Sequence, residues 1–225
     1  MNQLKGKKVL VLLSGGPDSK TLTKFAEEEG ADLIGALYLR SGHDTDEQEI
    51  SAARKIAAQH KIPLEIIDIS DVVKKLGGER IIMHAGATLM EFGLPIVLSI
   101  GIAHALRIAA DALCIALHAD DVSQNHSYSQ PFLDQVQALA SATSPNAPRI
   151  LVPFLSLSKQ EVFALGLHLG VDYGDTWSCT TSPHQHCGLC GACRARAQAF
   201  AIVGAIDPTT YAVMPTLREA IILRV

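Results

Sequence analysis

The fold is set by residues 8–30, which read KVLVLLSGGPDSKTLTKFAEEEG. The apolar run Lys8–Leu13 predicts a buried strand, and the segment from about Ser19 to Glu29 predicts a helix that Gly30 closes. A turn with paired glycines, Ser14–Asp18, joins the two. A strand, a glycine turn and a helix in this order are typical of the first unit of a parallel sheet.

The same alternation continues along the chain. Short apolar runs rich in β-branched residues alternate with longer segments of helical period. We expect further strands at 33–39, 64–69, 112–117 and 150–154, and helices at 45–60, 94–110, 130–142, 158–170 and 194–203. The pattern predicts an α/β, Rossmann-like fold with a parallel five-stranded sheet flanked by helices. It places the sheet domain in residues 1–170 and a smaller C-terminal region in residues 171–225.

Composition excludes several classes of protein. The chain has 225 residues and a formal net charge of −4, and 48% of its residues are hydrophobic, as in an ordinary globular protein. Direct binding to nucleic acid is not expected, because such binding depends on many phosphate contacts and no block of lysine and arginine is present. No apolar stretch reaches the roughly 20 residues of a membrane span, and no signal-peptide cleavage site is seen. We therefore expect a cytoplasmic protein without a membrane partner.

The glycine turn predicts a phosphate site. Gly15 and Gly16 let the backbone approach an anion, Ser14 and Ser19 add hydroxyl donors, and the helix that follows supplies free N–H groups. The turn contains neither a Walker motif nor GxGxxG. The alternative interpretation is a plain glycine-rich turn capped by Asp18 or Ser19.

A cluster of cysteines predicts a metal site. The chain has five cysteines, of which Cys114 lies in an apolar run and is expected in the core. The other four are Cys179, Cys187, Cys190 and Cys193. Four thiolates at this spacing suit a closed, structural Zn²⁺ site, and an iron–sulfur cluster is the competing interpretation. His184 and His186 lie within the cluster and are expected to be solvated loop residues rather than ligands.

The turn resembles the pyrophosphate-binding loop of the N-type ATP pyrophosphatases, the PP-loop proteins. This resemblance implies an adenine nucleotide alpha hydrolase-like fold and an enzyme that activates a carbonyl group by adenylation. It implies that Ser14, Gly15, Gly16, Asp18 and Ser19 contact ATP, and that Asp18 helps to hold Mg²⁺. A carboxylate is a poor acceptor for an amine, and adenylation gives it AMP as a leaving group.

A second resemblance is more specific. Residues 175–179, DTWSC, and 186–196, HCGLCGACRAR, are similar to segments of the 7-cyano-7-deazaguanine synthase family. That family converts 7-carboxy-7-deazaguanine and ammonia to a nitrile with ATP, on the queuosine pathway, and carries zinc on four such cysteines. The likeness implies a substrate-binding role for Tyr38 and His43 and a catalytic, phosphate-binding role for Lys159 beside Asp18. It also implies a homodimer.

Other segments depart from that family's pattern. Residues 91–97, EFGLPIV, stand where a Pro-Gly-Arg-Asn segment is usual, residues 128–131, YSQP, replace Tyr-Pro-Asp-Cys, and Lys20 replaces a small hydroxyl residue. Asp120 and Asp121 follow the predicted fourth strand, where they either accept hydrogen bonds from a guanine-like edge or form a solvated loop. His118 and His126 are expected to be polar loop residues.

Three alternatives therefore stay open for the function. The first is a variant that passes the adenylated acid to a different amine, such as a protein amine in an antiphage system. The second is a tRNA-modifying enzyme of the same superfamily. The third is a nucleotide-binding or zinc-dependent interaction module without turnover.

Overall fold

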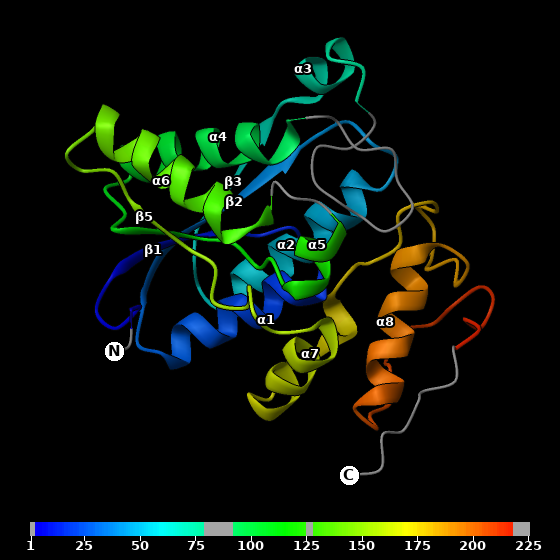
Figure 1. The fold of residues 1–225 in the computed structure, drawn as a ribbon. Coiled ribbons are helices and arrows are strands. Elements are labelled where there is room, and N and C mark those ends of the chain that lie inside the picture. Colours follow the sequence, from blue (N-terminus) through cyan, green and yellow to red (C-terminus); the bar gives the residue numbers. More distant parts are fainter. Residues whose placement is uncertain (1–2, 79–91, 125–127, 218–225) are drawn as a thin grey trace.

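The sheet stands at the centre of the molecule in the computed structural model, which describes residues 3–78, 92–124 and 128–217 (Figure 1). Its strands are β1 (Lys8–Leu12), β2 (Asp32–Arg40), β3 (Leu64–Asp68), β4 (Ala112–Cys114) and β5 (Arg149–Leu151). All neighbours pair in parallel, in the order β3-β2-β1-β4-β5. The chain runs outward from β1 to β3 and then returns to the other side of β1. This reversal opens a crevice at the carboxyl ends of β1 and β4.

Helices cover both faces of the sheet. They are α1 (Pro17–Glu28), α2 (Asp46–Gln59), α3 (Ser70–Lys75), α4 (Gly93–Arg107), α5 (Ala119–Gln124), α6 (Gln130–Thr143), α7 (Lys159–His168) and α8 (Gly191–Ile202), with a 3-10 turn at Tyr173–Asp175. Helices α4 and α6 lie on one face, while α1 and α7 lie on the other (Figure 1). A parallel sheet that is covered on both faces requires strands that are apolar on both sides.

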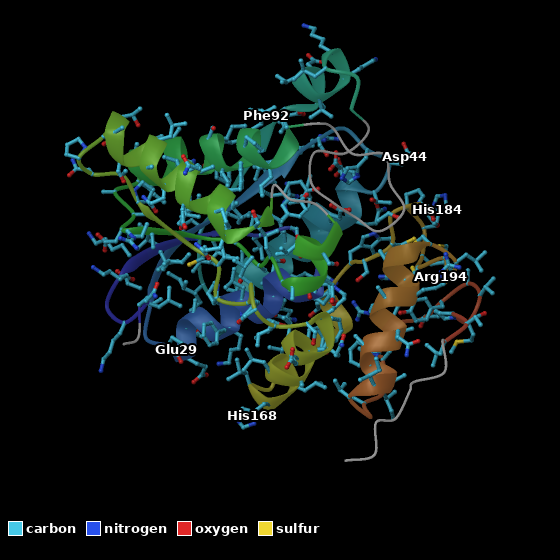
Figure 2. All side chains as sticks on the ribbon, viewed as in Figure 1. Glu29, Asp44, Phe92, His168, His184 and Arg194 are labelled. Carbon is cyan, nitrogen blue, oxygen red and sulfur yellow. The ribbon has the colours of Figure 1, made fainter. Side chains whose placement is uncertain are left out.

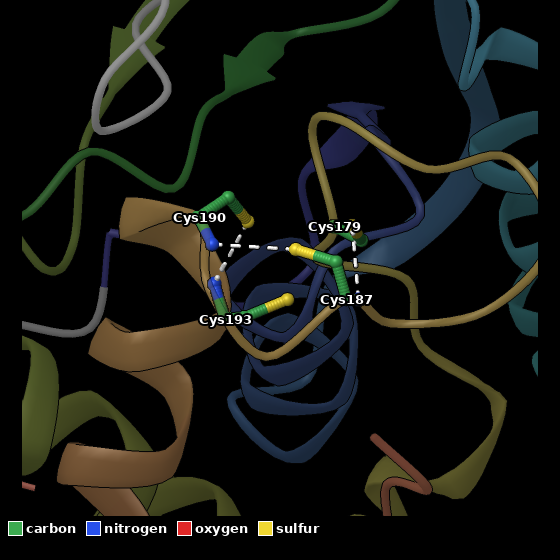
Figure 3. Close-up of side chains that lie close together, drawn as sticks. All are labelled: Cys179, Cys187, Cys190 and Cys193. Carbon is green, nitrogen blue, oxygen red and sulfur yellow. Dashed lines mark hydrogen bonds between the residues drawn. The ribbon is translucent and has the colours of Figure 1, made fainter. Parts of the chain in front are cut away.

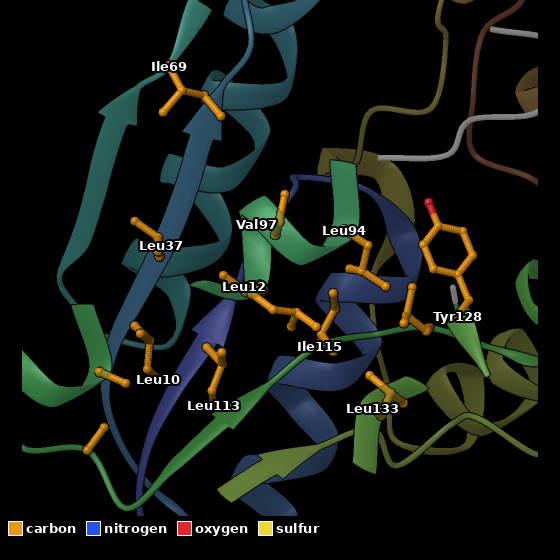
Figure 4. Packing of buried hydrophobic residues seen from close by; sticks show 14 of the residues in the cluster. Leu10, Leu12, Leu37, Ile69, Leu94, Val97, Leu113, Ile115, Tyr128 and Leu133 are labelled. Atoms are coloured by element: carbon orange, nitrogen blue, oxygen red, sulfur yellow. The ribbon is translucent and has the colours of Figure 1, made fainter. Parts of the chain in front are cut away.

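Alternation along β1 builds a separate core on each face. Leu10 and Leu12 point into the cluster that α4 and α6 cover, where Leu113 also packs (Figure 4). Val9 and Val11 point to the opposite side, where they pack in the cluster that α1 and α7 cover. Each of these side chains is less than 8% exposed, so β1 is buried on both faces from Val9 to Leu12.

The predicted α/β sheet with five parallel strands is confirmed, with differences at the ends of strands. β4 ends at Cys114 and β5 at Leu151, so both are shorter than predicted. The chain beyond β4 lines the crevice, and the chain beyond β5 enters a turn. The helices α3 and α5 were not predicted, since six residues are too few to show a helical period. α1 begins at Pro17 rather than near Ser19, as suits a proline in the first helical position.

The C-terminal segment packs against α1 and α7 through aromatic rings. Phe163 of α7 stacks on Tyr173 at a ring distance of 4.9 Å, and Phe200 of α8 meets Phe163 edge-on at 5.0 Å. The Tyr173 hydroxyl lies 2.8 Å from Thr21 Oγ1 on α1. Helix α8 is thereby held beside the helix that carries the glycine turn. Across the described ranges, no helix has the length and apolar character to cross a membrane.

Candidate functional site

A cavity of about 290 Å³ occupies the crevice at the carboxyl ends of β1, β2 and β4. Its polar lining includes the glycine turn and Lys159, and also Tyr38, His43 and Glu49. Its apolar lining includes Leu37, Val97, Ile115, Leu117 and Tyr128. A pocket that is mostly apolar and has a few polar groups is typical of a small-molecule site.

The glycine turn presents an open helix N-terminus to this cavity. Gly16 is the N-cap of α1, and no side chain caps the helix there. The alternative interpretation of a turn capped by Asp18 or Ser19 is therefore wrong. Gly15 has a φ of +77°, and a methyl group at this position would overlap the Glu49 carbonyl oxygen of α2. The free N–H groups and the positive end of the helix dipole together suit an anion.

An ion pair lies beside the glycine turn in the cavity lining. Lys159 Nζ lies 2.7 Å from Asp18 Oδ2, and His118 Nε2 lies 4.0 Å from the same oxygen. Burial works to raise the pKa of Asp18, but the positive charges of Lys159 and His118 outweigh it and the pKa is lowered. Asp18 Oδ1 is buried without a hydrogen-bond partner among the described residues. A buried carboxylate oxygen in this state suits a cation.

Asp120 and Asp121 both line the cavity, and part of their hydrogen-bonding capacity is used within the protein. Asp120 Oδ2 accepts a hydrogen bond from the Lys159 backbone N–H at 2.9 Å, which ties α5 to the start of α7. Asp121 Oδ2 accepts one from the His118 N–H at 3.0 Å, and burial raises the pKa of Asp121. The two carboxylates therefore belong to a built wall of the cavity and not to a solvated loop.

Tyr38 and His43 of the cavity lining belong to a second polar cluster, with Asp46 and Glu49 of α2. The Tyr38 hydroxyl donates to Asp46 Oδ1 at 2.7 Å and lies 3.1 Å from Glu49 Oε2. His43 Nε2 lies 3.1 Å from Asp46 Oδ1 and 3.5 Å from Glu49 Oε2. Burial, together with these carboxylates, raises the pKa of Tyr38, so the phenol stays a neutral donor.

The four predicted metal ligands come together (Figure 3). The Sγ atoms of Cys179, Cys187, Cys190 and Cys193 all lie within 4.8 Å of one another. Cys187 Sγ accepts hydrogen bonds from the backbone N–H groups of Leu189 and Cys190, each at 3.3 Å. Such bonds favour a thiolate over a thiol, and the pKa of Cys190 is lowered by its hydrogen bonds within the cluster. The arrangement can hold a metal ion.

The two histidines near the cysteines differ in their environment. His184 is exposed at the outer surface, as expected (Figure 2). The expectation that His186 is solvated is wrong: its ring is buried and lies 4.4 Å from the Trp177 ring. His186 Nε2 accepts a hydrogen bond from the Ser178 N–H at 3.0 Å, and burial lowers its pKa to about 4. Its role is therefore to support the loop, and not to bind the metal.

Several residues of the site were not identified from the sequence. His118 was expected in a polar loop, but it is buried at the cavity wall. Lys20, noted from the sequence as a departure, does not line the cavity. It is buried in α1, its ammonium has no hydrogen-bond partner among the described residues, and burial lowers its pKa. Trp177 and Ser178 line the cavity, and the signal for them was the DTWSC segment that carries the family resemblance. His126 lies outside the described residues, as do residues 79–91.

Comparison with protein families gives one match over most of the chain. A family model described as "Queuosine biosynthesis protein QueC" matches residues 8–204. Among curated proteins, the 7-cyano-7-deazaguanine synthase of Methanospirillum hungatei is 34% identical over 220 residues, covering 91% of this chain and 99% of that protein. The protein of the same name from Methanosphaerula palustris is 33% identical over 225 residues, with the same two coverages.

Solved structures support the fold. The U34-tRNA thiolase NcsA from Methanococcus maripaludis, solved with its [4Fe-4S] cluster, gives a TM-score of 0.53 at 22% identity over 75% of this chain and 59% of that one. The NH3-dependent NAD synthetase from Campylobacter jejuni gives 0.52 at 18% identity, over 75% and 66% of the two chains. At these identities the similarity concerns the arrangement of the sheet and helices alone.

Proposed function

The chain belongs to the QueC family of queuosine biosynthesis proteins, and on this premise we propose that it is an ATP-dependent 7-cyano-7-deazaguanine synthase. It is an enzyme of the ATP-dependent carbon–nitrogen ligase type. The observation that carries the proposal is the open N-terminus of α1 beside the Asp18–Lys159 pair, in a cavity with a mostly apolar lining. This combination suits a nucleoside triphosphate next to a flat organic acid.

The first step in the proposal is adenylation of the acid. A carboxylate oxygen attacks the α-phosphorus of ATP, a C–O–P linkage forms, and pyrophosphate leaves. Ser14, Gly15, Gly16 and Ser19 would contact the phosphates, and Lys159 would balance the charge that develops on the leaving pyrophosphate. Mg²⁺ bound with ATP would supply further charge neutralisation, and Asp18 would hold it through its buried, unpartnered oxygen.

The later steps consume the amine. Ammonia attacks the activated carbonyl carbon, the C–O bond to AMP breaks, and an amide forms. A second ATP adenylates the amide oxygen with release of pyrophosphate. The nitrogen then loses both protons, the C–O bond to AMP breaks, and the nitrile forms. The polar groups of the cavity lining would orient the acid, with Asp120 and Asp121 accepting hydrogen bonds from its guanine-like edge and Tyr38 and His43 also contacting it.

For the cysteines we propose one structural Zn²⁺. Four sulfurs at about 2.3 Å from one tetrahedral ion lie roughly 3.8 Å apart. The Sγ separations of no more than 4.8 Å fit this geometry, whereas an iron–sulfur cluster has its own irons and sulfides between the thiolates and needs more room. With all four positions filled by protein, the ion would stabilise the loop and take no part in the reaction.

The position of the cysteines argues against the tRNA-modifying alternative if that chemistry needs a cysteine in the cavity. Four of the five cysteines are in the cluster, and Cys114 is buried in β4, where burial raises the pKa of its thiol to about 12. A thiol with such a pKa is a poor nucleophile at neutral pH. The alternative of a different acceptor amine keeps the same adenylation step.

Product analysis with labelled ammonia tests the proposed function. The purified protein is incubated with ATP, Mg²⁺, 7-carboxy-7-deazaguanine and ¹⁵N-ammonia, and the products are analysed by mass spectrometry. We expect a nitrile that carries the label, together with AMP and pyrophosphate. AMP formation without a labelled nitrile would assign the adenylated acid to a different amine. No consumption of ATP or of the acid would contradict the synthase proposal.

A further inference from the structure

The peptide group between Gly15 and Gly16 has a defined orientation. Its carbonyl oxygen, on Gly15, accepts a hydrogen bond of 3.0 Å from the Trp177 backbone N–H. Because a trans peptide is planar, its C=O and N–H bonds point in opposite directions. The Gly16 N–H therefore points away from Trp177, and it donates to Ser14 Oγ at 3.3 Å. Both Gly16 and Ser14 line the cavity, so this orientation turns the N–H to the side of the turn where Ser14 lies.

Glycine does not hold such an orientation by itself. Both residues of the pair lack a Cβ, and the conformational cost of rotating this peptide is small compared with other residue pairs. Within the turn, the Gly16 N–H donates a long hydrogen bond, of 3.3 Å, to Ser14 Oγ. The hydrogen bond from the Trp177 N–H, which lies outside the turn, favours one orientation of the Gly15–Gly16 peptide. The neighbouring backbone is also close, since a Cβ on Gly16 would lie 3.7 Å from the Trp177 carbonyl oxygen.

Trp177 belongs to the segment 173–178, which we call the strap. Arg196 of α8 donates hydrogen bonds to the strap. Its guanidinium is fully buried and donates to Thr176 Oγ1 at 2.6 Å and to the Tyr173 carbonyl oxygen at 3.0 Å. It also pairs with Asp207 at 3.1 Å, so its charge is balanced within the protein. A buried guanidinium whose donors are used in this way fixes the groups that it contacts.

The strap is also tied to the cysteine cluster. Trp177 Nε1 donates to the Cys179 carbonyl oxygen at 2.8 Å, and the Ser178 N–H donates to His186 Nε2 at 3.0 Å. Arg196 lies one turn after Cys193 in α8, the helix that has Cys190 as its N-cap. The strap therefore has two supports, one in the cysteine loop and one in α8.

We propose that the strap orients the Gly15–Gly16 peptide for phosphate binding, with Trp177 acting through its backbone N–H and with Arg196 and Thr176 as positioning residues. The four-cysteine element thereby contributes to nucleotide binding, besides its contribution to stability. The inference rests on the proposed function only in that the ligand is ATP. Neither Trp177 nor Arg196 needs to contact the reacting atoms.

A matched pair of variants separates the backbone N–H from the indole. Trp177→Pro and Trp177→Phe both lose the indole, but only Trp177→Pro loses the N–H. The conformation of Thr176 is compatible with a proline at the next position, because Thr176 is already extended, at φ −97° and ψ 150°. Affinity for Mg·ATP is measured by titration calorimetry, and the Gly16 amide is followed by ¹H–¹⁵N NMR in the absence of nucleotide.

We expect Trp177→Pro to bind ATP at least about tenfold more weakly than Trp177→Phe, since loss of the Trp177 N–H removes the bond that directs the Gly16 N–H toward a charged phosphate. We also expect the Gly16 resonance to shift in Trp177→Pro and to stay near its normal position in Trp177→Phe. Equal affinities together with equal Gly16 resonances would overturn the proposal. If the wild-type protein binds ATP but makes no nitrile, the proposed function fails, and the ATP affinities of the two variants still test the role of the strap. If the wild-type protein does not bind ATP, the Gly16 resonances of the two variants test whether the strap orients the peptide.

A second pair covers the case in which Trp177→Pro does not fold, as judged by metal content and thermal unfolding. Thr176→Ser keeps the hydroxyl that Arg196 contacts, and Thr176→Val removes it at nearly the same volume. We expect Thr176→Val to bind ATP more weakly, by about three- to tenfold, and Thr176→Ser to restore the affinity. Identical affinities at equal metal content would overturn the role of Arg196 and Thr176.

Discussion

Replacement of Lys159 by methionine is expected to lower kcat/KM for acid-dependent pyrophosphate release by about 10²–10³-fold. Lys159 Nζ is the cation at the glycine turn, 2.7 Å from Asp18, and its side chain is only 19% exposed. Methionine keeps most of the length and removes the charge that would balance the leaving pyrophosphate. Because that charge grows toward the transition state, we expect the loss mainly in kcat. Steady-state kinetics with a coupled pyrophosphate assay measure it.

Lys24→Met is the matched control. Lys24 is on α1 and pairs with Glu27 and Glu28 at the surface, so its loss is expected to change the rate less than about twofold. Wild-type rates in Lys159→Met would contradict the role of Lys159.

A difference in stability between wild type and Lys159→Met provides a second readout. The lowered pKa of Asp18 stabilises the fold above pH 3.8, and this contribution is lost as the pH falls through the pKa of the folded state. Removal of Lys159 should therefore destabilise the protein at pH 7 and less so in acid.

Replacement of Cys190 by serine is expected to release the metal and to lower the melting temperature by roughly 8–16 °C. A metal present at about 1,000 times its Kd stabilises by about 4 kcal/mol, and each kcal/mol shifts Tm by about 2–4 °C in a chain of this size. Cys190 is also the N-cap of α8, where its Sγ accepts from the Cys193 N–H at 3.4 Å. Serine is a favoured N-cap, so the substitution keeps the cap and removes the thiolate.

Metal content by mass spectrometry and unfolding by calorimetry measure this effect. We expect one zinc ion per chain in the wild type and a large loss in Cys190→Ser. Cys114→Ala is the control, because it removes a buried thiol from β4, away from the cluster, and should keep the full metal content. Unchanged metal content and stability in Cys190→Ser would contradict the metal site. Iron in place of zinc would contradict the choice of metal.

Much of the site was predictable because its signals are local in sequence. The glycine turn lies between one strand and one helix, and three of the four cysteines lie within seven residues, 187–193. Both features need only a short stretch of backbone to become a site, so spacing was sufficient to predict them. The parallel sheet followed from the same kind of reasoning, since alternating strands and helices favour such a sheet. The order of its strands was not predicted.

The remaining features depend on contacts between distant segments. Arg196 belongs to the segment that carries the family resemblance, but its burial depends on contacts with Tyr173, Thr176 and Asp207. No local sequence pattern predicts these contacts. His118 is buried because α5 forms immediately after it and because Asp18 and Asp121 approach its ring. The contact between Trp177 and Gly15 joins a residue of the C-terminal region to one near the start of the sheet domain, so the two are far apart in sequence. Tertiary packing decides such contacts, and periodicity carries no information about them.

Isotope exchange between pyrophosphate and ATP tests the central claim, adenylation of a deazaguanine acid, most directly. Labelled pyrophosphate enters ATP only if the enzyme forms the adenylate reversibly, and no amine is needed. We predict that the zinc-loaded protein catalyses this exchange when 7-carboxy-7-deazaguanine is present, that ammonia is not required, and that exchange stops without the acid. Exchange that does not depend on the acid, or no exchange although ATP is bound, would contradict the account.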